Sequence, residues 1–157
     1  MVIDDFSSLD LWRFVTDGVM GGVSEGTMAR GREGDVDYVR LRGNVSTENN
    51  GGFIQIRRDM SPLPPEAQVL TLRVRGNGAS YFANLRTTDA KRPWHSYRAE
   101  FQTTNEWRDI TLPLADFAPA GRGFDVPLNT KNIRAIGIIA YGRDYAADVS
   151  VAQIGWR

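Results

Sequence analysis

The chain has 157 residues, which is enough for one domain with a closed hydrophobic core. Its 19 basic and 19 acidic residues cancel, so no net charge attracts the whole molecule to nucleic acid or to anionic lipid. There are no cysteines, and disulfides, thiolate catalysis and Cys-ligated metal centres are therefore excluded.

The N-terminal segment predicts neither export nor membrane insertion. It reads MVIDDFSSLDLW, with no basic start and no apolar run of signal-peptide length. No stretch of the chain approaches the roughly 18 apolar residues of a membrane span. We therefore expect a soluble, cytoplasmic protein with no nucleic-acid partner.

The predicted elements are strands, because apolar and polar residues alternate with a period of two along much of the chain. In one such run Leu70, Leu72 and Val74 fall on one face, with polar residues on the other. The predicted strands, in chain order, are Val2–Phe6, Leu11–Val15, Tyr38–Val45, Phe53–Arg57, Val69–Arg75, Ser80–Arg86, His95–Gln102, Trp107–Leu114, Ile133–Tyr141 and Val149–Trp156.

Turn residues separate these strands. Asn77-Gly78 is the strongest short hairpin signal in the chain. The longest connection, Leu114–Asn132, contains Phe117 and Phe124, which favour a loop packed on the core over a functional flap. No window of ten or more residues has helical periodicity. Many short strands separated by turns predict an all-β sandwich or barrel, in a single domain of residues 1–157.

One motif resembles a catalytic one. Gly22–Gly26 matches G-x-S-x-G, and Ser24, Asp89 and His95 follow in the triad order of α/β-hydrolases. That motif requires a helix after the serine, whereas residues 27–34 are interrupted by glycine and are not helical. We therefore predict no catalytic residue and no enzymatic activity.

The sequence also restricts which metal sites the chain can form. With His95 as the only histidine, a His-rich metal site is impossible. A structural Ca²⁺ near the termini requires Asp4, Asp5 and Asp148 to converge, and acidic turns without a metal are commoner. We predict no metal ligands and no cofactor, with that calcium site as the open alternative.

The glycine-rich segment 16–26 is unusual. Its glycines allow positive φ or close backbone approach, its Asp and Ser side chains can bond that backbone, and its methionine is a flexible apolar plug. It is interpreted either as a tightly packed turn or as a contact surface. The candidate contact residues are Asp17, Gly18, Met20, Gly21, Gly22 and Ser24.

The segment Asp17–Ser24, with Trp12 upstream, resembles the signature of the complex I intermediate-associated protein 30 domain family. Gly43–Phe53 resembles the family stretch G-x-V-S-x-E-N-x-G-G-F. Further matches lie at Leu72–Gly78 with Tyr81, at Tyr97 and Phe101, and at Trp107 with Leu112–Phe117.

The resemblance implies a two-sheet antiparallel jelly roll of the galactose-binding-domain type, similar to carbohydrate-binding modules. It also implies a non-enzymatic, chaperone-like role, best described in mitochondria as assisting assembly of respiratory complex I. The sequence shows no transit peptide and no extra N-terminal region, so it resembles the bare bacterial domains, whose role is generally unassigned. The first functional hypothesis is a protein-interaction or assembly module.

The second hypothesis is a carbohydrate or small-molecule binding module, and it comes from the arginines. The basic residues are 17 Arg and only two Lys, a bias that GC-rich coding also produces. The candidate residues are Arg73, Arg75, Asn84, Arg86 and Arg98, in a wider set with Arg40, Arg42 and Arg57. The hypothesis expects these side chains on one sheet face, with two or more guanidiniums free of carboxylates. It fails as stated if they lie on both sheets, and the plain alternative is a solvated face of ion pairs.

Overall fold

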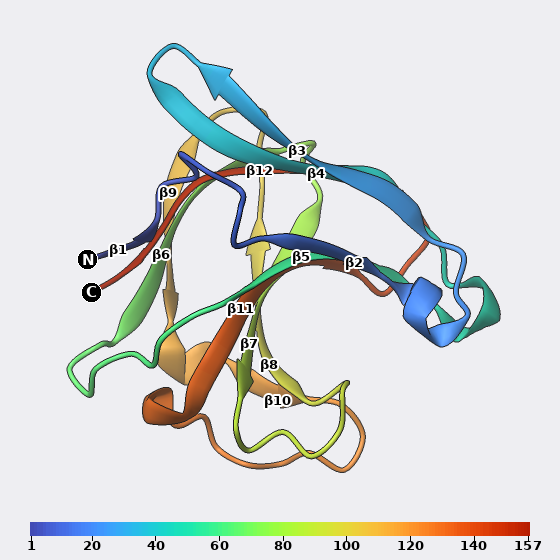
Figure 1. The fold of residues 1–157 in the computed structure, drawn as a ribbon. Helices are drawn as coiled ribbons and strands as arrows, with labels where there is room; N and C mark the ends of the chain where they lie inside the picture. The colour runs from blue at the N-terminus through green and yellow to red at the C-terminus, as the bar shows by residue number, and fades with distance from the viewer.

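Twelve β-strands and four short 3₁₀ helices build the computed structural model, which describes residues 1–157 (Figure 1). Sheet A has the order β3-β4-β12-β6-β9, with β1 beside β12, and sheet B has the order β10-β8-β7-β11-β5-β2. Every strand pair is antiparallel. The predicted two-sheet antiparallel jelly-roll sandwich is confirmed.

The strands of sheet A are β1 (Val2–Asp4), β3 (Glu25–Glu33), β4 (Val36–Val45), β6 (Val69–Gly76), β9 (Arg108–Pro113) and β12 (Tyr145–Trp156). Those of sheet B are β2 (Arg13–Thr16), β5 (Phe53–Asp59), β7 (Ser80–Thr87), β8 (Ser96–Gln102), β10 (Ala118–Ala120) and β11 (Ile133–Tyr141). The 3₁₀ helices are η1 (Asp17–Met20), η2 (Glu48–Asn50), η3 (Leu114–Asp116) and η4 (Thr130–Asn132). None of these helices is long and apolar enough to cross a membrane.

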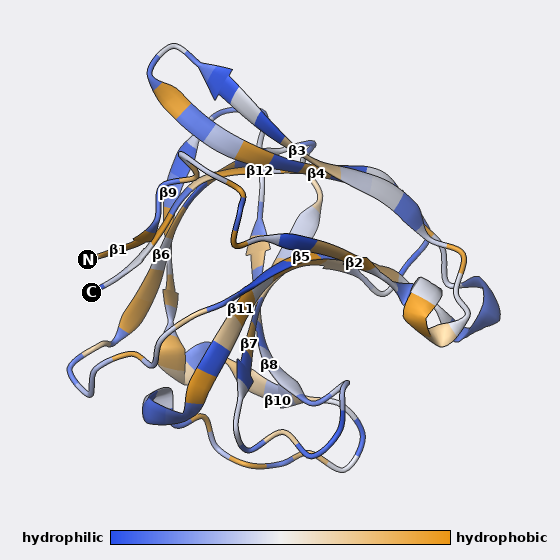
Figure 2. Ribbon diagram, viewed as in Figure 1, coloured by the Kyte–Doolittle hydropathy of each residue, from blue (hydrophilic) through white to orange (hydrophobic).

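The core lies between the two sheets, because each strand turns alternate residues inward. Leu70, Leu72 and Val74 of β6 are buried as the alternation predicts. Thirty buried residues, drawn from both sheets and the loops, form one hydrophobic cluster. Figure 2 shows the resulting mixture of hydrophobic and hydrophilic residues along the strands of both sheets.

The predicted dipeptide Asn77-Gly78 forms a turn, but the expected hairpin is wrong, because β6 belongs to sheet A and β7 to sheet B and the two strands do not pair. Gly78 has φ of 87°, which a side chain would disfavour. Asn77 does more than turn the chain, because its Oδ1 accepts from the Tyr81 hydroxyl at 2.7 Å and its Nδ2 donates to the Ala146 carbonyl at 2.9 Å. This turn between the two sheets is thereby tied to β12. Burial raises the pKa of Tyr81 to about 12, so this hydroxyl remains a donor at any physiological pH.

The chain ends lie side by side at one edge of the sandwich (Figure 1). The Met1 amino group donates to the Trp156 carbonyl, and the Trp156 amide donates back to the Met1 carbonyl, each at 2.9 Å. Beyond β1 the chain crosses from sheet A to sheet B, and Phe6 fills the crossing with no exposed surface.

The loop 114–132 and strand β3 differ in how well the sequence predicted them. The loop 114–132 is packed, since Phe117 and Phe124 are both buried, as expected. Strand β3 was not predicted, because most of its residues are exposed and their polarity does not alternate. It forms because β4 offers it a full antiparallel ladder from Glu25 to Glu33.

Candidate ligand-binding site

The glycine-rich segment is organised by one buried carboxylate. Asp17 begins η1 and has no exposed surface. One carboxylate oxygen accepts from the Ser24 amide at 3.0 Å. The other accepts from the Ser24 hydroxyl at 2.5 Å and from the Gly52 and Phe53 amides at 2.6 and 3.3 Å. Burial alone would raise the pKa of Asp17, but these donors outweigh burial and hold the pKa below its ordinary value.

Two glycines leave room for this carboxylate. A Cβ on Gly22 would lie 2.6 Å from an Asp17 oxygen, and a Cβ on Gly51 would collide with the same carboxyl group. Gly21, which ends η1, has φ of 82°, as expected for at least one glycine of this pair. The segments 17–24 and 43–53, which are distant in sequence, therefore meet at one side chain.

The exposed part of the segment is apolar. Asp17 and Ser24 use their polar groups inside the chain, and Gly18 donates its amide to the Thr16 hydroxyl at 3.1 Å. Val19 and Met20 are 77% and 58% exposed, and orange patches mark the hydrophobic residues of η1 in Figure 2. What the loop offers to another molecule is this apolar tip.

Ser24 and His95, which the G-x-S-x-G match placed in triad order, lie in separate hydrogen-bond networks. The Ser24 hydroxyl donates to Asp17 and to the Ser46 carbonyl at 3.1 Å. His95 is buried, stacks on Phe124 with ring centroids 4.7 Å apart, and accepts from the Lys91 amide at 3.2 Å. Neither side chain contacts the other.

The acidic residues near the termini do not converge either. Asp4 accepts from the Trp12 indole and from Arg58, each at 2.8 Å, while Asp148 binds Arg40. No group of three or more His, Cys, Asp or Glu side chains is placed to hold a metal ion.

The prediction that these arginines share one sheet face is wrong. Strands β4 and β6 belong to sheet A, whereas β5, β7 and β8 belong to sheet B, so the two groups lie on opposite sides of the molecule. The sequence pattern is the same for both sheets of a sandwich, because each strand has one outward polar face. The arginines on sheet A are Arg40, Arg42, Arg73 and Arg75, and those on sheet B are Arg57, Arg86 and Arg98.

On sheet A most of these charges are neutralised. Arg40 makes a bidentate pair with Asp148 at 2.9 and 2.6 Å, which lowers the pKa of that carboxyl group. Arg75 lies 2.7 Å from Glu33 and 4.5 Å from the ring centroid of Trp107. A longer pair, of 3.7 Å, joins Arg73 to Asp109.

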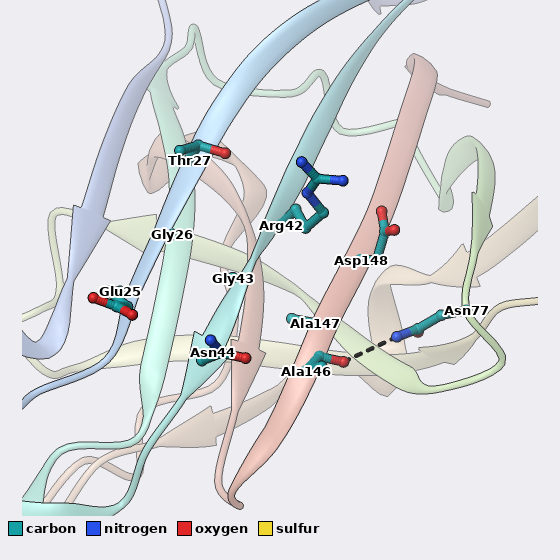
Figure 3. A pocket seen from close by; sticks show the side chains of 10 residues that line it. All are labelled: Glu25, Gly26, Thr27, Arg42, Gly43, Asn44, Asn77, Ala146, Ala147 and Asp148. Atoms are coloured by element: carbon teal, nitrogen blue, oxygen red, sulfur yellow. Dashed lines mark hydrogen bonds between the residues drawn. The ribbon is translucent and has the colours of Figure 1, made fainter.

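Sheet A also has a hollow of about 650 Å³ that sequence reasoning missed (Figure 3). Its floor is the pair Gly26 and Gly43, which face each other on β3 and β4 and allow the two backbones to approach. The lining residues are Glu25, Gly26, Thr27, Arg42, Gly43, Asn44, Asn77, Ala146, Ala147 and Asp148. The facing glycines were the available signal, but only the strand register brings them together. Of the residues predicted to bind a ligand, only Arg42 lines this hollow.

On sheet B the outward residues form a polar row in register across four strands. The row runs Arg98, Asn84, Gly137 and Arg57, on β8, β7, β11 and β5. Because Gly137 has no side chain, Gln55 can reach over β11, and its Oε1 accepts from Asn84 Nδ2 at 3.2 Å.

Several polar atoms of this row have no partner. Asn84 is 6% exposed, and its Oδ1 makes no hydrogen bond. The Nε atoms of Arg57 and Arg98 are likewise buried without a partner. Buried polar groups in proteins are nearly always satisfied, so these atoms leave hydrogen-bonding capacity for water or for a bound molecule. We call Gln55, Arg57, Asn84, Arg86 and Arg98 the polar row of sheet B.

The charges of this row are not neutralised by carboxylates. No Asp or Glu oxygen lies within ion-pair distance of Arg57, Arg86 or Arg98, and Arg86 donates only to the Pro93 carbonyl, at 2.8 Å. Burial, followed by repulsion from Arg13 and Arg86, lowers the pKa of Arg57.

Aromatic rings lie beside the row. Tyr141 is 44% exposed and lies under the Arg98 guanidinium, 4.2 Å from its ring centroid. Phe82, on the neighbouring strand β7, meets Tyr141 edge to face at 6.1 Å. Two other tyrosines lie away from this row: Tyr38 packs against Trp107 on sheet A, and Tyr97 is buried in the core.

Solved structures with a similar fold include several carbohydrate-binding modules. A family 11 module of the cellulase Lic26A-Cel5E from Clostridium thermocellum matches with a TM-score of 0.80 and 12% identity, over 99% of this chain and 92% of that one. A family 11 module from the same organism, in complex with a β-1,3-1,4-mixed-linked tetrasaccharide, matches with a TM-score of 0.76 and 12% identity over 99% and 93%. A family 4 module matches with a TM-score of 0.56 and 14% identity over 98% and 90%.

At these identities the likeness shows the fold alone. No curated protein sequence matches the chain significantly. The model of the complex I intermediate-associated protein 30 (CIA30) family, however, matches residues 2–149. That match contains both segments that meet at Asp17 and all five residues of the polar row, and it shows that this chain belongs to the CIA30 family.

Proposed function

We propose that this chain is a non-catalytic binding module that holds a hydroxyl-rich, carbohydrate-like ligand on the outer face of sheet B. The observation that carries the proposal is the unpartnered Oδ1 of the buried Asn84, flanked by guanidiniums without carboxylates. An amide oxygen accepts from a hydroxyl group, and guanidinium groups donate to one. The hydroxyl groups of a sugar ring can donate to the Asn84 oxygen and accept from the guanidiniums.

The aromatic pair supports the same class of ligand. Tyr141 exposes nearly half of its surface beside the polar row, and Phe82 holds it edge to face. Amphipathic rings of this kind give sugar rings an apolar platform while the polar row reads their hydroxyls. A family 11 module with this fold was solved in complex with a β-1,3-1,4-mixed-linked tetrasaccharide, which places carbohydrate first among ligand classes to test.

The experiment is a glycan array, followed by calorimetry with the best ligand. We expect Asn84→Ala and Tyr141→Ala each to weaken binding about tenfold, which is the loss of ~1.4 kcal/mol. The matched control is Tyr38→Ala, which removes an aromatic ring from sheet A and should leave affinity unchanged. If all three variants bind equally well, the ligand does not lie on sheet B.

The second candidate is a protein-assembly module, favoured by the family and by the apolar loop tip. Val19 and Met20 are exposed on a loop that Asp17 holds rigidly, an arrangement suited to contact with a protein partner. Crosslinking mass spectrometry in native lysate should lose one defined partner with Val19→Ser and Met20→Ser combined. Leu11→Ser, at another exposed apolar site, should retain that partner.

A further inference from the structure

We propose that the ligand of sheet B is an acidic saccharide, whose carboxylate or sulfate groups pair with Arg57, Arg86 and Arg98. This inference rests on the proposed binding function and specifies the charge of its ligand. Three guanidiniums without carboxylate partners lie on β5, β7 and β8 of one sheet, in a chain whose total charge is zero.

The acidic residues of the same face do not neutralise these three arginines. Asp59 lies 3.5 Å from Arg13, and Glu100 is exposed opposite Phe82 without an ion pair. Like charges on adjacent strands repel one another, so the unliganded face lacks a counter-charge. Burial is the largest cause of the lowered pKa of Arg57, and the charges of Arg13 and Arg86 lower it further against a smaller opposing effect of Asp59.

The arginine-rich composition by itself does not explain the deficit. On sheet A, Arg40, Arg73 and Arg75 each lie within 4.0 Å of a carboxylate oxygen. Three of the four sheet A arginines are therefore paired, Arg42 being the exception, whereas none of the three arginines on sheet B is paired. A guanidinium matches a carboxylate or sulfate through two parallel hydrogen bonds, which makes an oxyanion the fitting counter-charge.

The surroundings favour an anion attached to a saccharide over a free ion. The unpartnered Asn84 Oδ1 is an acceptor and repels an oxyanion, so it requires a hydroxyl or amide donor close to the charged group. Tyr141, held under Arg98, offers a ring surface at the end of the same row. Acidic sugars carry a charged group, donor hydroxyls and an apolar ring face in one molecule.

The test compares charged saccharides with their neutral forms. Calorimetry is performed with tetragalacturonate and with its methyl ester, which lacks the charge and keeps the ring hydroxyls. A sulfated galactan tetrasaccharide and its desulfated form make the parallel arm and distinguish uronate from sulfate. Inorganic sulfate is the probe for a simple anion. We expect at least one charged saccharide to bind about tenfold tighter than its neutral form and than inorganic sulfate, and to weaken as salt rises from about 50 to about 500 mM.

The variants localise the effect. Arg86→Gln and Arg98→Gln should each remove most of the preference for the charged form, with the melting temperature reporting that the protein remains folded. The matched control is Arg108→Gln, an equal change of charge at an exposed position on β9 of sheet A, which should keep the preference.

The failures are distinguishable. If a neutral saccharide binds as tightly as its charged form and Asn84→Ala still weakens it, the acidic ligand is wrong and the binding function survives. If inorganic sulfate binds as tightly as the saccharide, the saccharide assignment is wrong. If no probe binds and no variant changes the result, both proposals for this face are overturned.

Discussion

At the scale of single residues, Asp17 shows how a polar group becomes structural. Its carboxylate is fully buried with no salt bridge, yet its pKa lies below the ordinary value because amide and hydroxyl donors satisfy both oxygens. The residue type and the nearby glycines were visible in the sequence. Burial of the group was not, because the Gly52 and Phe53 amides that bind it lie 35 and 36 residues away along the chain.

We expect Asp17→Asn to lower the free energy of unfolding by roughly 2 kcal/mol at neutral pH, because a side-chain amide cannot accept at both ends. The wild-type carboxyl group has a folded-state pKa below that of the unfolded chain, about 3.9. Its contribution is therefore present above that pH and is lost as the pH falls through the folded-state value. Urea denaturation between pH about 2 and 7 should show a shallower acid loss in the variant. Equal stability across that range would remove Asp17 from this role.

At the scale of elements, β11 is the strand that makes the polar row continuous. Its apolar residues predicted a buried strand, and Ile136 and Ile138 do face the core. Gly137 lies between them and faces the outer side of the sheet. In the sheet it opens the path by which Gln55 reaches Asn84, a consequence that depends on which strands lie on either side.

Gly137→Ala should therefore break the row. Its Cβ would lie 2.6 Å from Gln55 Oε1 and 3.0 Å from the Ile56 carbonyl oxygen, so the Gln55 side chain must move away from Asn84. We expect a loss of stability of about 1 kcal/mol or more and a loss of ligand affinity greater than the stability change explains. Paired melting and calorimetry measure both effects. Unchanged affinity in a folded variant would show that the bridge does not shape the site.

At the scale of the whole molecule, the N-terminal crossing joins the two sheets. Phe6 adopts φ of 59°, unusual for a bulky residue, with its amide bonded to Asp4 at 2.8 Å and its ring 5.3 Å from that of Trp12. Asp4 also binds Arg58 of sheet B. These contacts fix the first residues of the chain to both halves of the sandwich.

Phe6→Ala should cost about 3–5 kcal/mol of stability, because it leaves a cavity between the sheets. Leu11→Ala, at a side chain that is 62% exposed, is the control and should change stability by less than about 0.5 kcal/mol. Thermal melting of both variants measures the difference. Similar melting temperatures would mean that the crossing contributes little to the association of the sheets.

The local sequence pattern was sufficient to predict most of the strands and the fold class. Burying one face of a strand imposes a period of two on contiguous residues, and the run at Val69–Arg75 carries that period, whereas Ile133–Tyr141 is a short, mostly apolar run buried on both faces. A mostly exposed edge strand shows no such alternation, so the strand Glu25–Glu33 was not predicted. The allocation of strands to sheets depends on pairing between distant residues, such as Asn84 with Gly137 and Gly137 with Arg57. Both outer faces of a sandwich show the same alternation, so only the tertiary structure separated the neutralised arginines from the unneutralised ones.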